Sequence, residues 1–160
     1  LILQSQGITL DDIHQVRSIL EVEIAGLAAQ SASEADLAAL TDLARQMEEA
    51  ENQPEVLARV DTGFHQLLAS LSGNPLLAVL LESFSNLMSE VRLVVQNHPA
   101  LRETVLPDHR RIIACIARHD PEGARAAMQV QLDHARAIQE EALARSSKHQ
   151  HDVVKSLDLS

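Results

Sequence analysis

The sequence predicts an all-α fold, an antiparallel bundle of about six to seven helices. Apolar residues recur at intervals of three and four along most of the 160 residues, which is the spacing of one face of an amphipathic helix. Hydrophobic residues make up 46% of the chain and aromatic residues only 1%, so the core must consist of Leu, Ile, Val, Ala and Met. The abundant Ala, Leu, Glu, Gln and Arg favour helices, and no strand pattern, glycine-rich loop or internal repeat appears.

Capping residues and a proline predict where the first three helices begin. Thr9 and Asp11 offer N-cap oxygens to the first helix. Ser33 and Asp36 approximate a capping box for the second helix, with Asp in place of Glu. Pro54 suits the first turn of the third helix. The predicted helices span residues 12–30, 33–51 and 54–73.

Prolines also precede or open each helix of the second half. The predicted spans are 75–96, 107–118 and 121–145, with a short irregular or helical stretch over 99–106. Apolar side chains cover well over half the circumference of the helix over 75–96. We therefore expect that helix to be central in the fold or buried in an oligomer interface.

The length of the chain fits a single domain with a real core. We expect residues 1–8 to be a connector from a missing N-terminal segment. Residues 9–145 form the expected helical domain, and residues 146–160 form a polar tail that frays.

Charge and composition exclude several classes of protein. The net charge of −10 and the lack of a basic stripe argue against nucleic-acid binding by this domain itself. The sole cysteine, Cys115, excludes an internal disulfide and a paired-cysteine metal motif, and we interpret it as a packing residue. No apolar run has the length of a membrane span and no secretory signal is present, so we expect a cytoplasmic protein without membrane contact.

The stretch Asp61-Thr-Gly-Phe-His65 places a carboxylate and an imidazole one helical turn apart on the same side. Such a pair can hold a divalent metal, share a proton or form an ordinary exposed ion pair. The spacing alone leaves these alternatives open.

A helical wheel places several further polar residues on or beside buried faces. Burying a charge without a partner is costly, so the economical hypothesis is that these residues meet at one site. They are Arg17, Asp61, His65, His109 and Gln131 or His134. Taken singly, Arg17 could instead pair with Glu21 one turn on, and His109 could bond to a backbone carbonyl.

One aspartate, two histidines and a further nitrogen or oxygen donor suit a divalent ion such as Zn²⁺, Ni²⁺ or Mn²⁺. The planar guanidinium of Arg17 fits a carboxylate. Together these groups predict a receptor for a small organic acid inside a helical bundle.

Four stretches of sequence carry a family resemblance, in a fixed order. They are Val16-Arg17-Ser-Ile-Leu-Glu21, Asp61-Thr-Gly-Phe-His65, Ser72-Gly-Asn-Pro-Leu-Leu77 and His109-Arg-Arg-Ile-Ile-Ala-Cys-Ile-Ala-Arg-His-Asp120. With these motifs, residues 10–143 resemble the FCD domain. This is the C-terminal effector domain of the FadR subfamily of GntR-type bacterial transcription regulators.

The resemblance implies a helical bundle that binds a small metabolite, often a carboxylate or sugar acid. Many members hold a divalent metal through one aspartate and three histidines, and Asp61, His65 and His109 match the first three ligands. The position of the fourth ligand is Gln131 here, with His134 one turn further on. Arg17 matches a position associated with the acid group of the effector.

The resemblance also implies a homodimer and an N-terminal winged helix-turn-helix that binds DNA and would precede residue 1. On this interpretation residues 9–145 are the effector-binding and dimerisation domain, and the chain is the sensing half of a repressor or activator and not an enzyme. Two alternatives remain at this point. One is a metal-dependent helical-bundle enzyme with Asp61 or His65 as the base, and the other is a purely dimerising scaffold.

Overall fold

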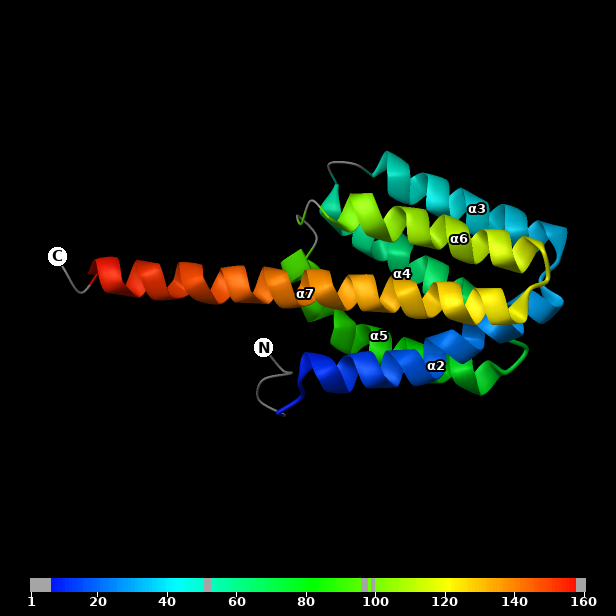
Figure 1. Ribbon diagram of the computed structural model, residues 1–160, viewed down its shortest axis with the longest axis horizontal. Coiled ribbons are helices and arrows are strands. Elements are labelled where there is room, and N and C mark those ends of the chain that lie inside the picture. Colours follow the sequence, from blue (N-terminus) through cyan, green and yellow to red (C-terminus); the bar gives the residue numbers. More distant parts are fainter. Residues whose placement is uncertain (1–6, 51–52, 96–97, 99, 158–160) are drawn as a thin grey trace.

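The computed structural model describes residues 7–50, 53–95, 98 and 100–157, which contain six α-helices, one π-helical turn and no strand (Figure 1). The prediction of an all-α fold is confirmed. The elements are α2 (Leu10–Ser31), α3 (Glu34–Glu49), α4 (Pro54–Leu71), α5 (Pro75–Val95), η1 (Leu101–Val105), α6 (Leu106–Ala117) and α7 (Pro121–Leu157).

Successive α-helices run in opposite directions, as the colours of Figure 1 show. In that view α3 and α6 lie on one side of the bundle, α2 and α5 lie on the other, and α4 and α7 pass between them. None of the described helices is long and apolar enough to cross a membrane.

Both predicted N-caps are present. Thr9 Oγ1 accepts from Asp12 N at 3.2 Å, and the Asp12 carboxylate accepts from Thr9 N at 2.8 Å. The reciprocal partner is therefore Asp12 and not Asp11. Ser33 and Asp36 form the second capping box, with distances of 3.3 and 2.9 Å. Each box satisfies amide groups that the first turn of a helix would otherwise leave exposed.

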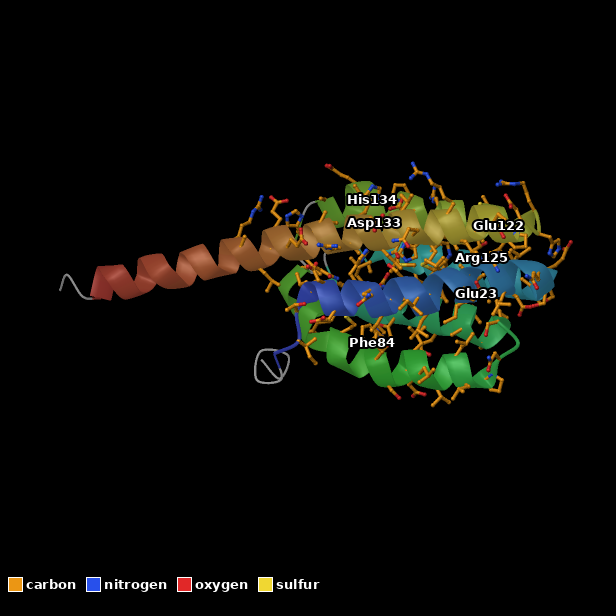
Figure 2. The ribbon with its side chains drawn as sticks, turned by 60° about the horizontal axis from the view of Figure 1, so that its bottom comes forward. Glu23, Phe84, Glu122, Arg125, Asp133 and His134 are labelled. Atoms are coloured by element: carbon orange, nitrogen blue, oxygen red, sulfur yellow. The ribbon has the colours of Figure 1, made fainter. Side chains whose placement is uncertain are left out.

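One large aliphatic core lies between α2, α3, α4, α6 and α7. Small residues on α2 allow its neighbours to approach closely. At Gly26 an added Cβ would lie 2.6 Å from the guanidinium carbon of Arg125. That guanidinium lies between Glu23 of α2 and Glu122 of α7 (Figure 2). The largest fully buried side chains are Ile24, Leu40, Met47, Phe64, Leu68, Met88, Ile112, Ile116, Met128, Leu132, His109 and Gln131.

The expectation that the apolar fourth helix is central is wrong. This helix, α5, lies at the edge of the bundle, and its side chains Leu76, Val79 and Leu80 are 61%, 56% and 44% exposed. The bundle covers only one side of α5, whereas apolar residues extend around more than half of it. The other expectation, an interface between copies, stays a prediction. Leu87, Val91 and Val94 lie outside the described side chains.

The expected end of the last helix near Arg145 is also wrong. In the structure α7 continues to Leu157, and its second half extends beyond the bundle (Figure 1). After Gly123 the helix contains no glycine or proline, so each further residue adds a backbone hydrogen bond without meeting a helix breaker. The polar composition of this segment does not by itself end a helix.

Candidate metal and effector site

Asp61, His65 and His109 meet in the interior of the bundle. The first two lie on α4 and the third on α6. His109 Nε2 lies 3.0 Å from Asp61 Oδ1, and His65 Nε2 lies 3.8 Å from the same oxygen. One ligand atom from each residue falls within 4.8 Å of the others. The histidines are only 2% and 0% exposed, so the alternative of an exposed ion pair does not describe this site.

Phe64 packs against both imidazole rings and orients them. Its ring meets His109 edge-to-face at a centroid distance of 4.6 Å and meets His65 edge-to-face at 5.7 Å. The two imidazoles are themselves 5.6 Å apart and nearly perpendicular. Such edge-to-face contacts are favoured by the charge distribution of the rings, so each imidazole has a defined direction.

The Nδ1 atom of each histidine, on the side of the ring away from Asp61, faces an oxygen. His109 Nδ1 lies 2.7 Å from the carbonyl of Val105, and His65 Nδ1 lies 2.5 Å from Glu21 Oε2. A neutral imidazole carries one proton, and these acceptors favour its position on Nδ1. Each Nε2 then presents a lone pair toward Asp61. Metal-ligating histidines are usually held in this way by carbonyls and carboxylates.

The buried acceptor atoms fit a divalent cation. Among the described residues, His65 Nε2, His109 Nε2 and Gln131 Oε1 are buried and make no hydrogen bond of good geometry. His65 Nδ1 also makes none, although it lies close to the carboxylate of Glu21. Lone pairs cannot satisfy one another, and a cation placed among them would remove this conflict. One carboxylate oxygen and two imidazole nitrogens are a donor set that Zn²⁺, Ni²⁺ and Mn²⁺ accept.

Glu21 belongs to the site, although the sequence showed it only as a helical neighbour of Arg17. Its carboxylate is 2% exposed and contacts both Arg17, at 2.6 Å, and His65. Burial alone would raise the pKa of Glu21. The charge of Arg17, aided by His65, outweighs burial and holds the pKa of that carboxyl well below its usual range.

Arg17 is buried, as predicted, and it also pairs with Glu21, so both expectations for this residue hold. Burial alone would lower the pKa of the Arg17 guanidinium, but the charge of Glu21 outweighs it and the pKa is raised. Glu21 accepts hydrogen bonds from Nε and Nη2. The charge of Asp61 also contributes to the raised pKa, so the guanidinium is influenced by the carboxylate of the triad as well as by Glu21.

A cavity of about 50 Å³ opens beside the triad. Because one water needs roughly 10–15 Å³ by this measure, the cavity has room for a molecule of a few non-hydrogen atoms. Arg17, Asp61 and Gln131 contribute polar groups to its wall, together with Gln139. The remaining wall is apolar, formed by Met47, Pro54, Leu57, Ala58, Met88, Val95, Val105, Leu106, Ala135 and Ile138.

The structure places the two candidates for the fourth metal ligand, Gln131 and His134, in different surroundings. Gln131 is 2% exposed and lines the cavity. His134 lies elsewhere on α7 (Figure 2), with its Nδ1 2.6 Å from Asp108 Oδ2 and its side chain 42% exposed. Asp108 is almost fully buried and also accepts from Arg111 at 2.7 Å. His134 is thus the partner of a buried carboxylate outside the triad.

Comparison with known proteins agrees with this fold. The FCD domain family matches residues 12–134. The HTH-type transcriptional regulator LutR of Bacillus subtilis (strain 168) is 30% identical over 129 residues, which cover 78% of this chain and 59% of that protein. The Glc operon transcriptional activator of Escherichia coli (strain K12) is 30% identical over 161 residues, which cover 95% of this chain and 59% of that protein.

The solved structure of Streptococcus agalactiae GntR is also similar, with a TM-score of 0.68 and 28% identity over 80% of this chain and 58% of that chain. The chain therefore spans a little under three fifths of the length of each of these relatives. The family match contains Arg17, Glu21, the three residues of the triad and Gln131. The chain belongs to the family of FCD domains.

Proposed function

We propose that this domain senses a small carboxylate and is the ligand-binding half of a GntR-type transcription regulator. The observation that carries the proposal is the triad of Asp61, His65 and His109, because Asp61 lines a cavity whose wall also contains Arg17. Its relatives LutR and the Glc operon protein are a transcriptional regulator and a transcriptional activator, which supports regulation and not an enzymatic role.

The charges around the cavity explain why an acid and a metal would bind together. Arg17 carries a positive charge, whereas Glu21 and Asp61 carry negative charges, so with neutral imidazoles the site has an excess of one negative charge. An organic acid would be repelled by that excess. A divalent ion, when bound to the triad, supplies two positive charges and an open position for an oxygen of the acid. The guanidinium of Arg17, which lines the same cavity, would then orient the carboxylate.

The cavity limits the acid to a short chain. Its volume of about 50 Å³ admits few atoms, and most of its wall is apolar. A small monocarboxylate or hydroxy acid satisfies both conditions, because its acid end meets the polar wall and its short body meets Met, Leu and Val side chains.

Regulation follows if the acid binds two arrangements of the helices with different affinity. The DNA-binding part lies in a winged helix-turn-helix outside this chain. The chain acts as a homodimer, and the exposed apolar side chains Leu76, Val79 and Leu80 of α5 form the surface for the second copy.

Metal titration tests the triad. The purified chain is stripped with a chelator and titrated by calorimetry with Zn²⁺, Ni²⁺ and Mn²⁺. We expect binding of one ion per chain, and we expect Asp61→Ala to abolish it. The control is Asp42→Ala, which removes an exposed carboxylate on α3 and should leave the affinity unchanged. A wild-type chain that takes up none of the ions would refute the metal site.

A thermal-shift screen of short organic acids tests sensing. We expect stabilisation by at least one acid in the presence of the ion and none in chelator. Arg17→Ala should lower the affinity for that acid. An unchanged affinity would show that Arg17 does not bind the acid. Chemical turnover of a stabilising acid would instead favour the alternative of a metal-dependent enzyme. If no acid stabilises the chain, the alternative of a purely dimerising scaffold would be favoured.

A further inference from the structure

Gln131 is a buried polar residue that the sensing proposal leaves without a role. It lies on α7, is 2% exposed and lines the same cavity as Arg17 and Asp61. Its Oε1 atom is buried and accepts no hydrogen bond within the part of the chain that the structure describes. An amide oxygen removed from water without a donor destabilises the folded state, so its position calls for a partner.

A second glutamine on α7 shows the usual arrangement. Gln129 Nε2 donates to Asp133 Oδ1 at 2.9 Å and to Ser18 Oγ at 3.3 Å, at the partly exposed surface of the helix. Gln131, two residues further, faces the interior instead. The other buried atoms there without a hydrogen bond include His65 Nε2 and His109 Nε2, which are also acceptors. Acceptors cannot bond to one another, but they can converge on one cation.

We propose that Gln131 supplies an oxygen ligand to the divalent ion held by Asp61, His65 and His109. The donor set is then two imidazole nitrogens and two oxygens. This inference rests on the metal triad of the proposed function. It assigns an amide oxygen to the position where the family pattern has a third histidine.

The oxygen changes which ion the site prefers. Imidazole nitrogen favours Zn²⁺, Ni²⁺ and Cu²⁺, whereas carboxylate and carbonyl oxygens suit Mn²⁺ and Mg²⁺. The amide is neutral, so the charge of the site is the same as with an imidazole at this position. Position 131 therefore sets the ratio of the affinities for Zn²⁺ and Mn²⁺, and glutamine shifts that ratio toward Mn²⁺.

The test measures that ratio in the wild type and its variants by calorimetry on chelator-stripped chains titrated with Zn²⁺ or Mn²⁺. Gln131→Leu should weaken Mn²⁺ binding by about tenfold or more, because a residue of similar size loses its oxygen. Gln131→His should raise the affinity for Zn²⁺ by at least about tenfold more than that for Mn²⁺. Gln129→Leu, the same substitution on the outer side of α7, should leave both affinities unchanged.

Misfolding is separated from ligand loss by thermal melting in chelator. There Gln131→Leu should melt no lower than the wild type, because an unsatisfied buried oxygen has been removed. Gln131→Glu keeps an oxygen and should retain Mn²⁺ binding. The inference is overturned if Gln131→Leu binds both ions as the wild type does, or if Gln131→Glu binds Mn²⁺ as weakly as Gln131→Leu. A wild-type chain without any metal affinity would refute the triad itself.

Discussion

At the scale of single residues, Glu21 links the two halves of the site. It neutralises Arg17 on its own helix and faces the Nδ1 atom of His65 on α4. One carboxylate thereby places the guanidinium that would meet an acid and fixes the imidazole that would meet a metal. A change at either partner is transmitted to the other through one buried side chain.

Glu21→Gln keeps the size of the side chain and removes its charge. We expect a loss of about 3–5 kcal/mol in the free energy of unfolding, because the buried Arg17 would lose the carboxylate to which it is hydrogen-bonded. Urea unfolding in chelator measures this loss. Glu23→Gln is the matched control, since Glu23 pairs with Arg125 at the surface and should cost about 0–1 kcal/mol. Equal losses in the two variants would contradict the buried pair.

The site could be predicted in part at this scale. Helical spacing alone indicates that Arg17, His65 and His109 face inward, because their apolar neighbours on each helix define the buried side. The contact between Glu21 and His65 could not be predicted in this way. Periodicity gives the direction of a side chain and not the residue that it meets on another helix.

At the scale of helices, the two capping boxes depend on ionised carboxylates. Hydrogen bonds from Ser33 lower the pKa of Asp36, so the ionised form stabilises the start of α3. A lowered pKa in the folded state means that this stabilisation is complete above the ordinary value of 3.8. It is lost as the pH falls through the lowered value.

Asp36→Asn should therefore destabilise the chain at pH 7 and make less difference near pH 3. The neutral amide lacks the charge that the carboxylate places at the helix N-terminus, and at low pH the native carboxyl loses that charge too. Urea unfolding of both proteins at the two pH values, in chelator, gives the comparison. A difference that is the same at both pH values would assign the effect to the hydrogen bonds alone.

Helix starts could be predicted better than the positions and ends of helices. Ser33 and Asp36 are close in sequence, so their capping box can be read locally. The edge position of α5 depends on which other helices exist to cover it, and no local pattern contains that information. The length of α7 shows that a polar segment without glycine or proline can remain helical.

At the scale of the whole molecule, the exposed face of α5 is expected to hold two copies together. Val79→Glu would place a charge on that face and should convert a dimer to a monomer, which light scattering coupled to size-exclusion chromatography detects. Val130→Glu is the matched control, because Val130 is an exposed apolar residue of α7, 40% accessible. Dissociation by the control alone would move the interface to α7.

The projecting end of α7 turns this helix into a lever. Gln131 and Ile138 form part of the cavity wall, and the same continuous helix runs to Leu157. At about 1.5 Å per residue, the tip lies roughly 39 Å from Gln131. A tilt of about 5° at the cavity would displace that tip by roughly 3 Å. A small tilt of α7 around a bound ligand of a few atoms would thus displace the C-terminal end of the helix by a distance comparable to the length of a hydrogen bond.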